Sequence, residues 1–174
     1  LPLSESAELK PVNIYGLSKV WQTSLAKYYR DNFNLRISIA RPFNITSADM
    51  HTTLSIGSFI NQINKCSSKG ILEVGNIETK RDFIDIEDAI EAFWAILINK
   101  DDDFIFNVCS GKSVLISKII KHLINVSEKE ISIFIDSNRV KTYDIADSYG
   151  NSAKIKNITG WIPQKNFLSC LDDA

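Results

Sequence analysis

Apolar residues follow two spacings along this chain, one typical of helices and one typical of strands. Apolar positions recur about every three to four residues in segments 14–32, 56–65, 86–99, 115–123 and 152–158, which predicts amphipathic helices. Short runs rich in β-branched and aromatic residues predict strands at 35–44, 71–74, 82–85, 104–108 and 131–135. A solvated turn is expected at 101–103. Because helices and strands alternate, the pattern favours an α/β fold.

The helical pattern also predicts which side chains are buried. We expect the helix at 14–32 to bury one face against a sheet. For the helix at 86–99, the residues expected to point inward are Ala89, Ile90, Phe93, Trp94 and Leu97.

The strand predicted at 35–44 ends in polar and breaker residues. Its apolar centre is typical of a buried strand, and Pro42 stops it. Ligands of α/β sheets gather at the carboxyl ends of the strands. We therefore expect a ligand-binding edge at Arg41, Pro42, Phe43 and Asn44.

The composition mainly excludes certain partners and kinds of site. The 174 residues carry a formal net charge of −1, which gives no electrostatic case for nucleic acid or a membrane as a partner. Cys66, Cys109 and Cys170 show neither a disulfide framework nor zinc-site spacing, and His51 and His122 stand alone. We expect no metal site and a cytoplasmic location.

Tyr15 and Lys19 are the pair with the clearest candidate chemistry. They are four residues apart at the start of a predicted helix, so both side chains can lie on one face. A phenol with a pKa of about 10 transfers protons poorly at neutral pH, and a nearby ammonium helps by stabilising the phenolate. The spacing alone also arises by chance, so the surrounding motifs must decide.

Five motifs occur in order along the chain. They are Tyr15-Gly16-x-Ser18-Lys19, Arg-Pro-Phe-Asn at 41–44, Val-Gly-Asn-Ile at 74–77, Arg-Asp-Phe-Ile-Asp at 81–85 and Phe-Asn-Val-Cys-Ser-Gly-Lys at 106–112. Together they resemble the extended short-chain dehydrogenase/reductase (NAD-dependent epimerase/dehydratase) family, whose members act on nucleotide sugars. Within that family the motifs are most similar to GDP-6-deoxy-4-keto-D-mannose reductases and then to GDP-mannose 4,6-dehydratases.

The resemblance implies a fold and a division of the chain. The fold would be the carboxy-terminal half of a Rossmann-like doubly wound sheet plus a smaller α/β substrate-binding lobe. Residues 1–47 and 79–110 would belong to the nucleotide-fold (Rossmann) domain. Residues 48–78 and 111–174 would form the sugar-nucleotide-binding lobe, and the complete enzyme would be a homodimer.

The resemblance also implies a reaction and its residues. Tyr15 would donate a proton, Lys19 would stabilise its phenolate, and both would contact the cofactor together with Pro42. The residues expected to bind the substrate are Asn44, Val74, Arg81 and Arg139. The cofactor would be NADP or NAD, and the reaction would be reduction of a GDP-4-keto-6-deoxy-hexose.

Several alternatives stay open at this point. Arg81 and Arg139 could each be a surface arginine paired with a nearby Asp, and Asn44 could form an Asx turn. Val74, with the Gly and Asn after it, could form a simple turn. The protein could instead be a dehydratase or epimerase of the same superfamily, or a non-catalytic sugar-nucleotide-binding or structural piece.

One expected motif is absent from the sequence. A dinucleotide-binding fold uses a glycine-rich turn to bring the pyrophosphate against a helix amino terminus, and the seven glycines here form no such turn. The family also places a catalytic serine or threonine upstream of the tyrosine. We therefore expect the chain to be the carboxy-terminal portion of an enzyme, inactive alone, with the cofactor bound mainly by the amino-terminal half.

Overall fold

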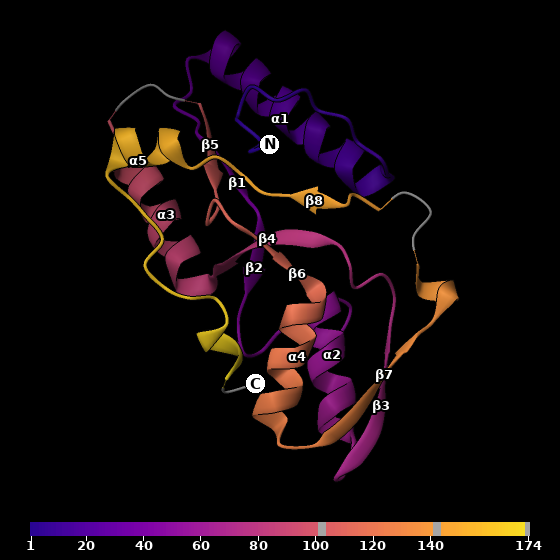
Figure 1. The fold of residues 1–174 in the computed structure, drawn as a ribbon. Helices are drawn as coiled ribbons and strands as arrows, with labels where there is room; N and C mark the ends of the chain where they lie inside the picture. Colours follow the sequence, from indigo (N-terminus) through magenta and orange to yellow (C-terminus); the bar gives the residue numbers. More distant parts are fainter. Residues whose placement is uncertain (101–103, 141–143, 173–174) are drawn as a thin grey trace.

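The computed structural model describes residues 1–100, 104–140 and 144–172, so the turn expected at 101–103 lies outside the described residues. The chain forms an elongated molecule with helices and strands at both ends (Figure 1). One end holds α1, α3, α5, β1 and β5, and the other holds α2, α4, β3 and β7 (Figure 1). This mixed α/β arrangement confirms the predicted fold class.

The helices lie close to their predicted positions. They are α1 (Ile14–Phe33), α2 (Ser55–Lys65), α3 (Ile86–Ile98), α4 (Ile116–Ser127) and α5 (Ala153–Thr159), with short 3-10 helices η1 (Ser137–Arg139) and η2 (Ser169–Leu171). Local chemistry explains several ends. Asn13 and Asp85 cap α1 and α3 by accepting backbone N–H bonds, and Gly160 ends α5 in the left-handed region with φ 75°.

Within the residues that the structure describes, the strands form three small sheets. They are β1 (Ile39–Pro42), β2 (Asn44–Thr46), β3 (Lys69–Val74), β4 (Lys80–Asp85), β5 (Ile105–Val108), β6 (Ser113–Leu115), β7 (Glu130–Ile135) and β8 (Asp147–Ser148). β1 pairs with β5 and β3 pairs with β7, both in parallel. β4 runs parallel to β2 and β8 and antiparallel to β6.

The strand predicted at 35–44 is divided in two by Phe43. β1 follows β5 as far as the pairing of Pro42 with Val108, where the Phe43 N–H still donates to Val108 O at 2.9 Å. The next residue, Asn44, pairs instead with Phe83 on β4. β6, β8, η1 and η2 were not predicted, because segments of two or three residues are too short to show a hydrophobic period.

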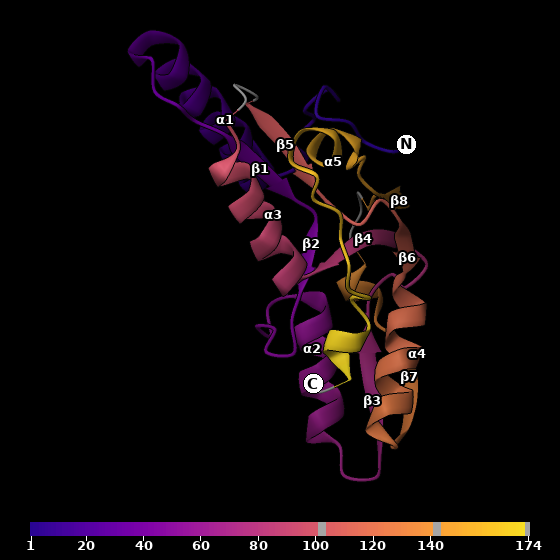
Figure 2. The same cartoon turned by 90° about the vertical axis from the view of Figure 1, so that its left-hand side faces the viewer.

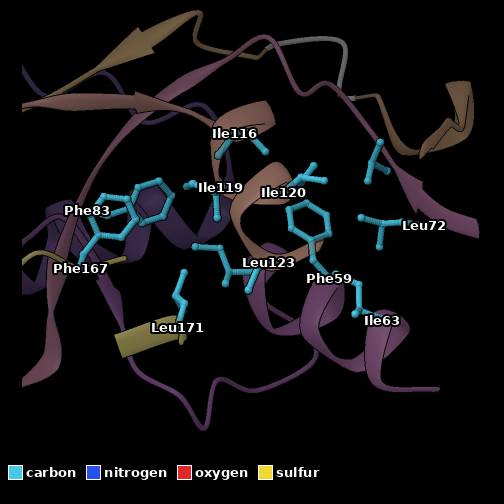
Figure 3. Packing of buried hydrophobic residues seen from close by; sticks show 12 residues of the cluster. Phe59, Ile63, Leu72, Phe83, Ile116, Ile119, Ile120, Leu123, Phe167 and Leu171 are labelled. Atoms are coloured by element: carbon cyan, nitrogen blue, oxygen red, sulfur yellow. The ribbon is translucent and has the colours of Figure 1, made fainter. Parts of the chain in front are cut away.

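A first core cluster fills the end of the molecule that holds α2 and α4. Its buried side chains come from both helices, from β3 and from the last residues of the chain (Figure 3). Phe83 of β4 stacks on Phe167 with ring centroids 5.2 Å apart, which ties the carboxy-terminal segment into this core (Figure 3). Aromatic pairs of this kind stabilise a core beyond their burial alone.

A second core cluster lies beside β1 and β5. Ile84, Phe106 and Val108 come from strands, while Ile155 and Trp161 come from α5 and the loop after it. α3 and α5 lie on one side of β1 and β5, and α1 lies on the other side (Figures 1 and 2). The two clusters meet along β4, because Phe83 belongs to the first and Ile84 to the second.

The predicted burial of two helix faces was wrong for the chain by itself. No residue of α1 is buried. On α3, Ala89 is buried as predicted, but Ile90, Phe93, Trp94 and Leu97 are exposed. The face of α3 that packs against the sheet consists of Asp88, Ala89, Ala92 and Ile96. α3 is apolar nearly all round, so its sequence pattern could not select one face.

Candidate active site

Tyr15 and Lys19 lie together at the start of α1. The Asn13 side chain accepts from the Gly16 N–H at 2.8 Å and so fixes where the helix begins. The Lys19 ammonium lies 5.4 Å from the centre of the Tyr15 ring and donates to Gln22 Oε1 at 3.2 Å. Tyr15 is 69% exposed, so its hydroxyl is open to a ligand. The geometry brings the pair together, and its catalytic role stays a prediction.

Pro42 and Asn44 lie at the ends of adjoining strands. Pro42 ends β1 and is exposed. Asn44 begins β2, and its Nδ2 donates to the backbone oxygen of Asp82 on β4 at 2.7 Å. Because that carbonyl can only accept, the Asn44 amide nitrogen must face it. The Oδ1 atom is then left to accept a hydrogen bond from a ligand.

Arg81 is held inside a set of contacts from its own chain. Its Nη2 forms an ion pair with Asp144 Oδ1 at 2.6 Å, and both side chains are only 22% exposed. Its Nη1 donates to Ile145 O at 2.5 Å and to Lys80 O at 2.7 Å. The ion pair considered in the sequence analysis is therefore present. A diphosphate bound by Arg81 would have to replace or share the Asp144 contact.

Arg139 is paired in a more open setting. Its Nη2 lies 2.7 Å from Glu73 Oε2, and its Nε donates to Asp136 Oδ2 at 3.3 Å. The backbone of Arg139 lies against Gly75, where an added Cβ would come within 2.6 Å of Arg139 O. Only glycine fits such an approach, so the turn after β3 and the end of η1 form one unit.

The structure changes the role available to Val74. Its side chain is 1% exposed and belongs to the first core cluster. The backbone oxygen of Val74 accepts from the Asp136 N–H at 2.8 Å. A nucleoside base packed here would therefore meet the Gly75 backbone rather than the Val74 side chain.

Sequence reasoning did not single out Glu5. Its Oε1 accepts from the Asn107 N–H at 2.9 Å, and its backbone oxygen accepts from Arg41 Nη1 at 3.1 Å. Burial lowers the pKa of Arg41, and the charge of Glu5 opposes this shift. These contacts tie the segment that leads into α1 to β1 and β5. No local pattern around Glu5 signals them, because the partners are far apart in sequence.

Two surface clefts lie away from the predicted residues. One has a volume of about 490 Å³ and lies between Ser47, the start of α3 and Cys170. The other, of about 290 Å³, lies between α2 and α4. Neither of these two clefts is lined by a predicted site residue.

The described residues add two further observations. Nowhere in them do three or more His, Cys, Asp or Glu side chains gather as metal ligands would. Within the same residues, no helix has both the length and the apolar character needed to cross a membrane.

The α/β fold, with a tyrosine and a lysine beside a parallel strand pair and arginines on neighbouring elements, is that of the extended short-chain dehydrogenase/reductases. More narrowly, the chain belongs to the GDP-mannose 4,6 dehydratase family, whose model matches residues 1–174. The predicted family is therefore confirmed.

Individual relatives agree with this assignment. The chain is 30% identical over 168 residues to GDP-6-deoxy-D-mannose reductase from Pseudomonas aeruginosa, covering 94% of this chain and 55% of the relative. It is 26% identical over 158 residues to GDP-6-deoxy-D-talose 4-dehydrogenase from Aggregatibacter actinomycetemcomitans, covering 91% of this chain and 52% of the relative. The chain thus spans about half the length of the curated relatives it matches.

Solved structures with a similar fold agree with this assignment. The structure of RMD from Pseudomonas aeruginosa complexed with NADPH has a TM-score of 0.90 at 28% identity, and the match covers 99% of this chain and 58% of that one. A UDP-glucuronic acid 4-epimerase from Bacillus cereus has a TM-score of 0.85 at 21% identity over 99% of this chain and 54% of that one, which shows a shared fold.

Proposed function

We propose that the complete enzyme reduces the C4 ketone of a GDP-linked 4-keto-6-deoxy-hexose, with NADP or NAD as cofactor. The observation that carries this proposal is the exposed Tyr15–Lys19 pair, with the ammonium 5.4 Å from the ring centre. The likeness to a GDP-6-deoxy-D-mannose reductase supports the choice of substrate.

The residues present fit one end of a nicotinamide dinucleotide. Tyr15, Lys19 and Pro42 are exposed and would meet its nicotinamide and ribose. When bound, the cofactor supplies the hydride for the reduction. The glycine-rich turn that would hold the pyrophosphate is not in this sequence. We infer that an amino-terminal half supplies it, so the chain alone would be inactive.

The proposed chemistry of this chain is a proton transfer. The Tyr15 hydroxyl would donate its proton to the alkoxide oxygen that forms at C4, leaving a phenolate. The positive charge of Lys19 would stabilise that phenolate. Tyr15 would later be reprotonated from solvent, which its exposure allows.

The division of labour between the lobes is part of the proposal. Residues 1–47 and 79–110 would act as the nucleotide-fold domain, and residues 48–78 and 111–174 as the lobe that binds the sugar nucleotide. Arg81 and Arg139 would exchange their carboxylate partners for the diphosphate. The uncovered apolar side chains of α1 support a homodimer as the working assembly.

Replacement of Tyr15 by Phe in the full-length protein tests the proposal. Loss of a general acid should lower turnover by about 10²–10⁴-fold and change the affinity for the sugar nucleotide little. Turnover is measured as the oxidation of NADPH in the presence of a GDP-4-keto-6-deoxy-hexose. Tyr28→Phe removes a hydroxyl farther along the same helix and should leave turnover unchanged. Near-normal turnover of Tyr15→Phe would contradict the proposed role of Tyr15 as proton donor.

A dehydratase is the second candidate, because the matching family model is described as GDP-mannose 4,6 dehydratase. Dehydration of GDP-mannose changes the sugar without net consumption of NADPH. Incubating the full-length protein with GDP-mannose and no reductant separates the two activities. Formation of a 4-keto sugar would favour the dehydratase, and NADPH-dependent loss of a keto sugar would favour the reductase.

A further inference from the structure

Asp82 lies where β4 changes partners. Residues Lys80 to Asp82 pair with β6, and the next residue, Phe83, pairs with Asn44 on β2. β4 also runs between the two ends of the molecule (Figure 1). Asp82 therefore lies at the junction of the two core clusters.

The Asp82 carboxylate is 0% exposed and accepts hydrogen bonds from three residues. Oδ1 accepts from the Ser110 N–H at 2.9 Å and from Ser110 Oγ at 2.6 Å. Oδ2 accepts from the Gly111 N–H at 3.0 Å and the Gly150 N–H at 3.1 Å. A buried carboxylate is tolerated only with such a complete set of donors. One side chain thus joins β4 to the loop after β5 and to the turn before α5.

The elements joined by Asp82 surround two predicted substrate-binding residues. Asn44 donates to the backbone oxygen of Asp82, and Arg81 directly precedes it. Gly150 packs closely on Phe43, the neighbour of Asn44, since a Cβ on Gly150 would come within 2.5 Å of that ring. The carboxylate anchors Gly150, and Gly150 packs on Phe43, so loss of this anchor would let the segment that carries Phe43 and Asn44 shift against Arg81 on β4.

We propose that Asp82 is a positioning residue that holds Arg81 and Asn44 at the spacing that a sugar nucleotide requires. The proposal rests on the proposed function. Asp82 acts through its neighbours, because a fully buried carboxylate with four short hydrogen bonds cannot touch a ligand.

Asp88 provides a matched control. It is 1% exposed, and its carboxylate also accepts backbone N–H bonds, from Gln164 at 3.0 Å and Lys165 at 2.9 Å. Asp88 lies on α3 and holds the carboxy-terminal segment, which contains no predicted site residue. Asp82→Asn and Asp88→Asn therefore remove comparable buried contacts, and only the first lies between predicted site residues.

The experiment compares both variants with wild type in the full-length protein. Calorimetry with GDP, the KM values for the GDP-4-keto-sugar and for NADPH, and the melting temperature are measured for each. We expect Asp82→Asn to weaken GDP binding and raise the sugar-nucleotide KM by about tenfold or more, the scale of one lost charge-assisted contact, with the NADPH KM within about twofold of wild type. Asp88→Asn should lower the melting temperature similarly and keep both KM values.

Three outcomes would overturn the proposal. They are unchanged GDP binding in Asp82→Asn, equal losses of GDP binding in the two variants, and a loss of NADPH affinity as large as the loss for the sugar nucleotide. A wild-type protein that binds GDP without reducing the keto sugar would contradict only the proposed function, and the GDP titrations would still test Asp82. A wild-type protein that binds no GDP would overturn both.

A milder pair of variants covers the case in which Asp82→Asn does not fold. Ser110→Ala removes the hydroxyl that donates to Asp82 Oδ1 and that also accepts from the Lys112 N–H at 3.3 Å, and it keeps the backbone donors to Asp82. We expect it to weaken GDP binding by about threefold, a small part of the effect of a charge-assisted bond. Ser127→Ala at the far end of α4 removes a comparable hydroxyl, which donates to Ile124 O and accepts from the Lys129 N–H, and it should leave the affinity for GDP unchanged. Equal GDP affinity of the two serine variants would also refute the proposal.

Discussion

Single residues of the candidate site are already engaged with their own chain. Arg81 is bound by Asp144, and Arg139 is bound by Glu73 and Asp136. Arginine forms bidentate hydrogen bonds with phosphate as readily as with carboxylate. A diphosphate could therefore replace these carboxylates without leaving a guanidinium unpaired.

The first prediction concerns Arg81 as a ligand of the diphosphate. Arg81→Ala in the full-length protein should weaken GDP-sugar binding by about 1.5–3 kcal/mol, the range for a charge-assisted hydrogen bond. Arg81→Lys should restore only part, since an ammonium lacks the planar fork. Calorimetric titration with GDP measures both. Asp144→Asn breaks the same ion pair and should keep GDP affinity. If it weakens binding as much as Arg81→Ala does, the arginine is structural.

Cys109 gives a prediction about pH. Burial, and to a lesser extent the charge of Asp82, raise the pKa of Cys109 to about 12. The unfolded thiol loses its proton near pH 9 while the folded thiol keeps it, so this group destabilises the fold as pH rises from about 9 to 12. In urea titrations, the stability advantage of wild type over Cys109→Ala should shrink above pH 9. A constant difference up to pH 11 would contradict the burial of the thiol.

At the scale of elements, helix ends follow local sequence more closely than helix faces do. Asn13, Asp85 and Gly160 mark ends through their own hydrogen bonds or backbone freedom. Which face of α1 or α3 is buried depends on the elements that pack beside the helix, and this cannot be read from the sequence of the helix itself.

Two glycine substitutions test this local control of helices. Gly160 ends α5 at φ 75° with nothing within 4 Å of an added Cβ, so Gly160→Ala should cost about 1 kcal/mol from backbone strain alone.

Gly16 lies inside α1 with ordinary contacts around an added Cβ, and Gly16→Ala should stabilise the fold by about 0.5–1 kcal/mol. Chemical denaturation measures both. A neutral Gly160→Ala would show that α5 ends for another reason.

At the scale of the whole molecule, two helices present apolar side chains to solvent. Trp21 on α1 is 63% exposed and Trp94 on α3 is 62% exposed. The two helices lie on opposite sides of β1 and β5 (Figures 1 and 2). Exposed apolar patches of this kind are typical of surfaces that another chain or segment covers. Their positions agree with a protein in which further structure packs on both sides of these strands.

The 174-residue chain should therefore self-associate when it is produced alone. We expect its mass, measured by light scattering, to rise with concentration. Trp21→Glu together with Trp94→Glu should reduce that rise, because a buried charge opposes burial of these faces. Lys118→Glu changes the charge of an exposed position on α4 and serves as the control. A concentration-independent mass for the unmodified chain would contradict the prediction.

The sequence by itself determined the α/β class, the family and the positions of the longer elements. Hydrophobic periods over nine or more residues mark helices such as α2 and α4, each of which buries one face. The ordered motifs from Tyr15 to Lys112 identified the family. Tyr15 and Lys19 were found because their spacing is local, about one helical turn.

Only the tertiary structure decided which contacts these elements make. The ion pair of Arg81 with Asp144, the burial of Val74 and the hydrogen bonds of Asp82 join residues far apart in sequence. The transfer of the chain from β5 to β4 at Phe43 likewise depends on which strand lies alongside. A sequence pattern records how a segment prefers to fold, whereas a contact depends on the partner that the whole fold brings near it.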